Sequence, residues 1–190
     1  RAVLAFWFGT GVDDAAVIAE KSAIWFRGGT GVDTTIRTDF AALRAAALEG
    51  QLDAWLDAPR GRLALVILVD QFSRNLFRDD PRAYTHDALA LAWCVESLGR
   101  SMDRALRPIE RVFLNMTLKH SEMLADKQLA VALFSALRDE VHPDLRETFN
   151  GFLDYAKRHR DVIARFGRFP HRNATLGRAS TDQERVFLDQ

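Results

Sequence analysis

The stretch Leu63-Ala-Leu-Val-Ile-Leu-Val69-Asp-Gln-Phe-Ser-Arg-Asn-Leu-Phe-Arg78 decides the fold class of this chain. Residues 63–69 are all apolar, so a helix formed from them is hydrophobic around its whole circumference and has to be surrounded by other helices. The residues that follow mix polar and apolar side chains. We therefore expect a buried central helix that begins near Gly61 and acquires a polar flank towards its C-terminal end.

The rest of the chain also shows helical spacing. Apolar residues recur three and four positions apart, and the alternation typical of strands is almost absent. We expect helices that begin at Asp33, Asp80-Pro81, Pro108 and Leu145, a short helix around Trp55, a helix that contains Leu129 and Leu137, and a terminal helix capped by Ser180 or Thr181. These segments predict an all-α fold, a single domain of antiparallel helices over residues 1–190.

Composition and charge exclude several classes of protein. The 190 residues are 48% hydrophobic and 27% charged, as in a folded globular chain, and 26 basic residues balance 26 acidic ones. This balance disfavours nucleic acid as a partner. The apolar run at 63–69 is much shorter than the roughly 20 residues that cross a bilayer, so we expect no membrane span. Phe6-Trp-Phe8 is typical of a folded core rather than a signal peptide, and the single Cys94 fits a reducing compartment, which predicts a cytoplasmic location.

The polar flank of the central helix is the first candidate site. Helical spacing places Asp70, Arg74 and Arg78 on one stripe, and Gln71 with Asn75 on the adjoining stripe. Burying such groups without partners costs about 1–3 kcal/mol for each neutral group and more for charges, so partners are required. Two interpretations stay open. The residues either form a structural network that contains an Asp70–Arg74 pair, or they line a ligand site.

Two histidines fall on apolar stripes further along the chain. His120 and His159 occupy positions that face inward, and a lone histidine at such a position is more often part of the core than a ligand or a base. If chemistry occurs, they are the candidate proton carriers, with Asp70 or Glu122 orienting them. Two residues along a regular helix correspond to about 200° of rotation, so His120 and Glu122 do not face one site if their helix is regular.

The segment from Arg158 to Arg178 is strongly basic, with six arginines, two histidines and one aspartate. Arginine binds carboxylate or phosphate through its planar fork, and a loop broken by glycine and proline aims several such groups at one anion. The candidate ligand-binding residues here are Arg160, Arg168, His171, Arg172 and Asn173. The alternative is a structural loop in which Phe166 and Phe169 fill the core while the arginines pair with acids.

Signatures of metals and cofactors are missing from the sequence. It contains no His-x-x-x-His, no Glu-x-x-His and no cysteine pair. The phosphate-binding Gly-x-x-x-x-Gly-Lys motif, the dinucleotide fingerprint and the Gly-x-Ser-x-Gly elbow do not occur either. We expect neither a bound metal nor a cofactor.

Five motifs resemble the bacterial domain-of-unknown-function family 924. They are Phe6-Trp-Phe-Gly9, Trp25-Phe26, Asp70 to Arg78, His120-Ser-Glu122 and His159 to Asn173. The resemblance implies an all-helical fold grouped with tetratricopeptide-like proteins, and it implies no established activity. The chain departs from the family at Ser73, where proline is usual, and around the His-Ser-Glu motif at Thr117, Leu118, Lys119 and Met123.

The leading functional prediction is a pocket for a small anionic molecule, built where the three polar motifs meet. Arg74, Arg160 and Arg172 would hold the anionic group, with Gln71, Asn75, Arg168, His171 and Asn173 as further ligand-binding residues. His120, His159, Asp70 and Glu122 are the candidate catalytic residues. The alternative is a tetratricopeptide-like scaffold that binds a protein or peptide, in which the polar motifs are purely structural.

Overall fold

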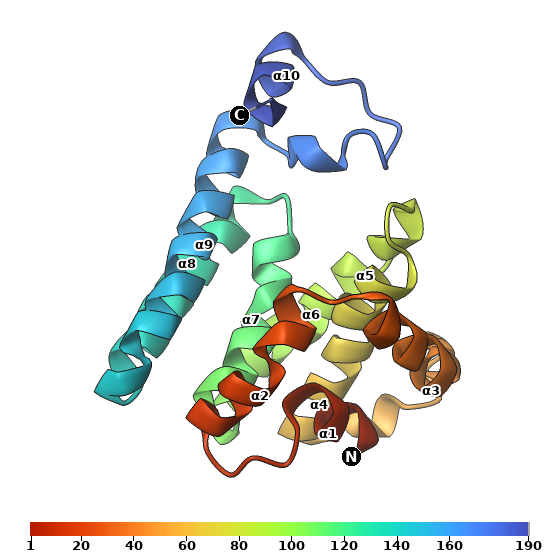
Figure 1. The fold of residues 1–190 in the computed structure, drawn as a ribbon, viewed down its shortest axis with the longest axis vertical. Coiled ribbons are helices and arrows are strands. Elements are labelled where there is room, and N and C mark those ends of the chain that lie inside the picture. The colour runs from red at the N-terminus through yellow and green to blue at the C-terminus, as the bar shows by residue number, and fades with distance from the viewer. Residues whose placement is uncertain (190) are drawn as a thin grey trace. The chain divides into compact units, whose positions relative to one another are not determined.

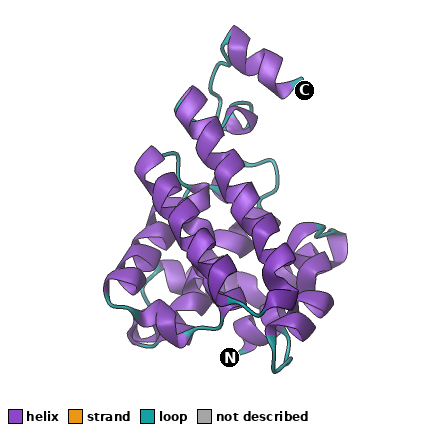
Figure 2. Cartoon of the chain, turned by 90° about the vertical axis from the view of Figure 1, so that its left-hand side faces the viewer, coloured by secondary structure: helices purple, strands orange, loops and turns teal. Residues whose placement is uncertain are grey.

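The computed structural model describes residues 1–189, which form only helices, turns and loops (Figure 2). The all-α fold class is therefore confirmed for this part of the chain. No helix within it combines the length and the apolar character that crossing a membrane requires.

The chain divides into two compact units. Unit 1 contains residues 1–78 and 82–117, and unit 2 contains residues 79–81 together with the chain from 118 onward. The main boundary lies between Thr117 and Leu118, near the C-terminal end of one helix. The organisation of residues 1–190 as one domain stays a prediction.

Unit 1 holds the elements that surround the central helix (Figure 1). In chain order they are α1 (Ala2–Phe8), α2 (Asp14–Phe26), α3 (Thr30–Leu48), the 3₁₀ turn η1 (Asp53–Asp57), α4 (Pro59–Val66), the π-helical turn η2 (Ile67–Gln71), α5 (Phe72–Leu76), α6 (Asp87–Gly99), the 3₁₀ turn η4 (Met102–Ala105) and most of α7 (Pro108–His120).

The central helix consists of α4, η2 and α5. Every residue from Leu63 to Val69 is at most 2% exposed, which confirms the prediction of a buried helix. Aromatic side chains pack beside it, with the rings of Trp7 and Phe72 centred 5.5 Å apart and those of Trp7 and Phe113 also 5.5 Å apart. These edge-to-face contacts help to hold α1 and α7 in place and so fix the frame around the polar flank.

The turn η2 interrupts the regular α-helix where the polar flank begins. The backbone N–H of Phe72 donates to the carbonyl of Ile67, five residues earlier, which is the hydrogen bond of a π turn. The wider turn changes the register of the side chains that follow it. The π turn includes Asp70 and Gln71, two of the predicted site residues. Such turns are frequent at functional sites.

Unit 2 is built on a helix pair. Its elements are the end of α7, α8 (Leu124–Glu140), the 3₁₀ turn η5 (Pro143–Leu145), α9 (Arg146–Phe166), the 3₁₀ turn η6 (Pro170–Arg172) and α10 (Asp182–Leu188). Helices α8 and α9 pack along each other, joined by the short turn at Pro143. Gly167 ends α9 with a φ of 69°, a left-handed conformation that glycine adopts without steric cost.

Several predicted boundaries need correction, whereas the last one is confirmed. Asp33 does not cap α3, which begins at Thr30, and the short helix around Trp55 is a 3₁₀ turn. The helix expected from Asp80 is also wrong, because only a 3₁₀ turn forms at Pro81–Ala83 and α6 begins at Asp87. The capping box at the start of α10 is present, with Thr181 and Glu184 bonding each other's backbone N–H groups.

Candidate functional site

Arg74 is the centre of the polar flank in unit 1. Its Nη1 lies 3.1 Å from Oδ1 of Asp70, one helical turn earlier. The same guanidinium binds Asp87 with both nitrogens, at 3.0 Å from Oδ1 and 2.9 Å from Oδ2. Burial lowers the pKa of Arg74, but the charges of Asp70 and Asp87 outweigh burial and keep this pKa above its usual value. The guanidinium therefore stays charged and fixed in position.

Asp33 is a third carboxylate at this flank, beside Asp70 and Asp87. It accepts from Asn75 Nδ2 at 2.8 Å, and from Arg78 Nε at 2.6 Å and Nη2 at 2.9 Å. These bonds, Arg78 first, lower the pKa of Asp33. Gly28 lies beside Nη2 of Arg78, and its φ of 58° is a left-handed conformation that favours glycine. Asp33 thus joins the start of α3 to the end of the central helix.

Ser73 makes two hydrogen bonds within the polar flank. Its hydroxyl donates to the carbonyl of Val69 at 2.5 Å and accepts from Nε of Arg44 at 2.7 Å. Arg44 is itself buried, at 8% exposure. Ser73 therefore supplies a partner for a buried guanidinium that proline could not bind.

A small cavity lies against this flank, with a volume of about 150 Å³. Gln71, Arg74 and Asn75, three of the predicted ligand-binding residues, line it together with Arg27 and Arg78. The Arg27 side chain is exposed and makes no hydrogen bond or ion pair with any residue in 1–189. The sequence prediction missed Arg27, since nothing in its own segment distinguishes it from other surface arginines.

Glu122 anchors the loop of unit 2 that follows α9. Helix α7 ends at His120, so Glu122 lies beyond the regular helix and is not held 200° away from His120. Its carboxylate accepts from the backbone N–H of Phe169 at 2.8 Å, and from Arg178 Nη1 at 2.7 Å and Nη2 at 3.0 Å. Burial raises the pKa of Glu122, but Arg178 and the Phe169 N–H outweigh burial, so this pKa is lowered.

Cationic side chains gather at the C-terminal end of α7. Lys127, which is 0% exposed, donates from Nζ to the carbonyl of Leu118 at 3.0 Å and also to that of Lys119. His159 Nδ1 lies 3.1 Å from the same Lys119 oxygen, and because a carbonyl only accepts, Nδ1 carries the hydrogen. Burial, followed by the neighbouring cation Arg172, lowers the pKa of Lys127 to about 7. Burial and Lys119 lower the pKa of His159 to about 3.

Phe169 lies at the centre of this cationic group. Lys127 Nζ is 4.7 Å from the ring centroid and Arg172 Cζ is 4.6 Å from it. The rings of His159 and His171 also lie against Phe169, at 5.0 and 5.2 Å between centroids. We call Lys119, Lys127, His159, Phe169 and Arg172 the cationic cluster of unit 2.

The remaining predicted residues have structural contacts. Arg168 binds Glu184 with two nitrogens, at 2.7 and 2.8 Å, and Asn173 Nδ2 lies 3.3 Å from the same carboxylate. The bonds from Arg168, followed by that from the backbone N–H of Thr181, lower the pKa of Glu184 to about 2. The contacts of Arg168 and Asn173 with Glu184 attach α10 to the loop. Arg160 instead pairs with its neighbour Asp161 at 2.7 Å, with 37% of its side chain exposed.

The predicted site residues thus fall into two groups. Unit 1 brings together Asp70, Gln71, Arg74 and Asn75, whereas His120, Glu122, His159, Arg160, Arg168, His171, Arg172 and Asn173 belong to unit 2. That the two groups share one site stays a prediction. Within residues 1–189, no group of three or more histidine, cysteine, aspartate or glutamate side chains is arranged to hold a metal ion.

Lys127 is the clearest residue that the sequence analysis missed, and a signal for it existed. It lies on the stripe Lys127, Ala130, Phe134 and Leu137, with spacings of three, four and three residues, and all four side chains are 0% exposed. A lysine in line with a buried apolar stripe indicates either a buried cation or an altered pKa.

Comparisons with known proteins agree with the fold and the motifs. A family model described as "Bacterial protein of unknown function (DUF924)" matches residues 3–190. The chain belongs to this family. A solved structure, that of the protein of unknown function ATU0120 from Agrobacterium tumefaciens, is 34% identical to this DUF924 chain, with a TM-score of 0.82 over 99% of this chain and 95% of that one. A comparison with curated proteins finds no match.

Proposed function

We propose that this DUF924 protein binds a small anion in the cavity lined by Arg27, Gln71, Arg74, Asn75 and Arg78. The observation that carries the proposal is that three arginines and two amide residues, Gln71 and Asn75, line one small cavity. Guanidinium and amide N–H groups are the donors that carboxylates and phosphates require.

The size and charge of the cavity indicate the class of ligand. Pockets for drug-sized molecules occupy about 300–1,000 Å³, so a cavity of about 150 Å³ suits a single phosphate or a short carboxylate rather than a nucleotide. Asp87 and Asp33 already bind Arg74 and Arg78, which fixes the geometry of these donors. Arg27 adds a positive charge that has no carboxylate partner within residues 1–189.

Binding is better supported than catalysis. The predicted proton carrier His159 has a pKa of about 3, and a base that weak accepts a proton inefficiently at neutral pH. We therefore keep acid–base roles for His120, His159, Asp70 and Glu122 as a prediction and give the anion cavity a binding role. We also propose a cytoplasmic location, which the buried free thiol of Cys94 supports.

The test is calorimetric titration of the protein with phosphate and, separately, with acetate. We expect one site per chain for at least one of these anions, and Arg27→Ala should weaken its binding about tenfold while leaving the melting temperature unchanged. The matched control is Arg104→Ala, which removes another exposed arginine of unit 1 that is free of ion pairs within the described chain. Absence of binding, or equal binding by the protein and its Arg27→Ala variant, contradicts the proposal.

The alternative function, a tetratricopeptide-like scaffold for a protein or peptide, stays a prediction. A pull-down that recovers one defined partner, with retention unaffected by Arg27→Ala, would favour the scaffold over the anion site.

A further inference from the structure

A second and larger cavity lies in unit 1, between α1, η1 and the start of α4. Its volume is about 610 Å³, within the range of pockets that bind small organic molecules. The apolar lining includes Leu4, Ala5, Trp55 and Ala64. Small alanine side chains leave space beside a large aromatic surface, which is the arrangement that accepts a flat or extended apolar group.

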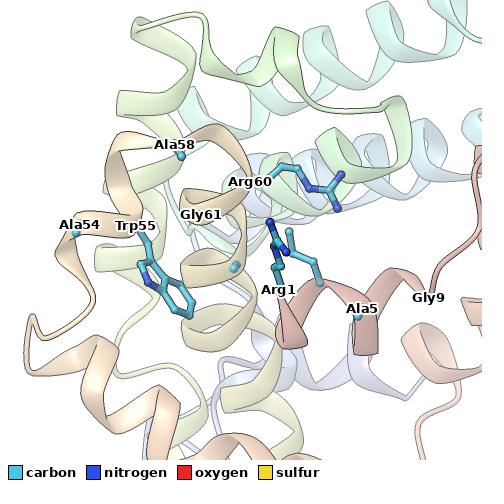
Figure 3. Close-up of a pocket in the computed structure, with 10 residues that line it drawn as sticks. Arg1, Ala5, Gly9, Ala54, Trp55, Ala58, Arg60 and Gly61 are labelled. Atoms are coloured by element: carbon cyan, nitrogen blue, oxygen red, sulfur yellow. The ribbon is translucent and has the colours of Figure 1, made fainter.

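Close packing of η1 on α4 places Trp55 beside this cavity. A Cβ on Gly61 would lie 2.3 Å from the carbonyl oxygen of Trp55, so only glycine lets η1 pack this closely on α4. Figure 3 shows the Trp55 ring on one side of the cavity, with Arg1 and Arg60 on the other side of Gly61. The cavity is therefore apolar on one side and cationic on the other.

Arg60 and Arg1 differ in their ion-pair partners. Arg60 Nη1 lies 2.8 Å from Oε1 of Glu110, yet 57% of the Arg60 side chain is exposed. Glu110 also accepts from the backbone N–H of Arg107 at 3.1 Å, so it does not depend on Arg60 alone. The Arg1 side chain makes no hydrogen bond or ion pair with any residue in 1–189. Both guanidinium groups can therefore receive an anionic group from solvent.

From this arrangement we infer that the cavity binds a small amphiphilic anion, with its apolar body against Trp55 and the alanines, and its carboxylate, phosphate or sulfonate group at Arg1 and Arg60. This site is separate from the anion cavity proposed above, with which it shares no lining residue. Its ligand also differs, because the larger volume and apolar lining require a hydrophobic body that the smaller cavity does not accommodate.

The probe for this inference is anilinonaphthalene sulfonate, which joins an apolar aromatic body to one anionic group. Its uncharged relative N-phenylnaphthylamine tests the apolar part alone. We expect both probes to bind one site per chain with increased fluorescence. Arg1→Ala should weaken binding of the sulfonate about threefold to tenfold and leave binding of the uncharged probe unchanged, and Arg60→Gln should act in the same direction.

A substitution that fills the cavity with a larger side chain tests where the probes bind. Ala5 is exposed and lines the cavity, so Ala5→Leu should reduce binding of both probes about tenfold, whereas Ala23→Leu, at an exposed alanine of α2 that does not line the cavity, should leave it unchanged. Ala54→Leu replaces Ala5→Leu if the latter lowers the melting temperature. Unchanged probe binding in the filled variants, or equal effects of Arg1→Ala on the two probes, overturns the inference. Arg27→Ala should leave probe binding intact, so failure of one site is distinguishable from failure of the other.

Discussion

The end of the central helix in unit 1 and the cationic cluster of unit 2 hold positive charge in different ways. In unit 1, Arg74 faces the carboxylates of Asp70 and Asp87, and its pKa is raised. In unit 2, Lys127 hydrogen-bonds two backbone carbonyls, and its pKa falls to about 7. Lys127 is fully buried, whereas 22% of the Arg74 side chain is exposed. The guanidinium therefore keeps its charge beside two carboxylates, whereas burial lowers the pKa of a lysine that has only carbonyl partners.

The difference has consequences for both stability and function. A guanidinium held by carboxylates keeps its charge over the whole physiological range and presents a fixed donor to a ligand. A cation held by carbonyls and aromatic rings loses its proton easily, which makes the stability of the folded chain depend on pH. The end of the central helix is therefore better suited to bind an anion. The cationic cluster is the region where stability should depend more strongly on pH.

The largest expected effect is at Arg74. Arg74→Ala leaves Asp70, which is 0% exposed, without its guanidinium partner, and we expect a loss of about 3–5 kcal/mol in the free energy of unfolding. Urea denaturation followed by circular dichroism measures this loss. Arg74→Lys retains the charge but not the two-nitrogen contact with Asp87 and should lose less. A loss below about 1 kcal/mol for Arg74→Ala would show that the pairing is dispensable.

The next effect concerns Lys127 and alkaline pH. The folded pKa of about 7 lies below the ordinary value of 10.5, so between these values the unfolded chain binds more protons than the folded chain. The Lys127 contribution to the free energy of unfolding therefore increases as pH rises from 7 towards 10. Lys127→Met should lack this increase. Denaturation curves at several pH values check the difference, and parallel pH profiles for the two proteins would contradict the lowered pKa.

A smaller effect is expected for His159 in acid. Its folded pKa of about 3 lies below the ordinary 6.5, so its contribution to stability is present above pH 6.5 and is lost as pH falls towards 3. Because the ring is only partly buried, solvent reduces the effect relative to Lys127. In His159→Gln the melting temperature should begin to fall only at lower pH, where Asp33 and Glu122 start to protonate. Thermal melts between pH 7 and 4 measure this difference. Melting temperatures that fall in parallel for the two proteins would contradict the lowered pKa of His159.

The smallest effect is expected at the exposed Arg160–Asp161 pair. Arg160→Ala should change the free energy of unfolding by at most about 0.5 kcal/mol, because both partners are in contact with water. The same denaturation assay applies. A change above about 2 kcal/mol would indicate a role in the fold that the exposed pair does not explain.

The sequence predicted features that depend on local patterns. The apolar run at 63–69 indicated the central helix, and the spacing of Thr181 and Glu184 indicated the capping box at α10. It also selected Gln71, Arg74 and Asn75, which line one cavity. Each of these signals is contained in a few consecutive turns of helix.

Features that depend on distant partners were not predictable in the same way. Asp33 resembled a helix cap because Asp at the start of an apolar stripe is the usual signal for one, but its carboxylate binds Arg78, 45 residues later. Asp87, which binds Arg74, lies in a segment where the local signal placed the middle of a helix. Residues such as Arg27 enter the site only through the packing of α2, which no local pattern specifies.

The most direct test of the anion cavity is a crystal structure of the protein grown in selenate, with anomalous diffraction recorded at the selenium edge. The account predicts an anomalous peak within hydrogen-bond distance of Arg27 and of at least one of Gln71, Arg74 and Asn75, with Arg74 still bound to Asp87. A cavity that contains only water at selenate concentrations well above those used for the titrations, with Arg27 directed into solvent, would contradict it.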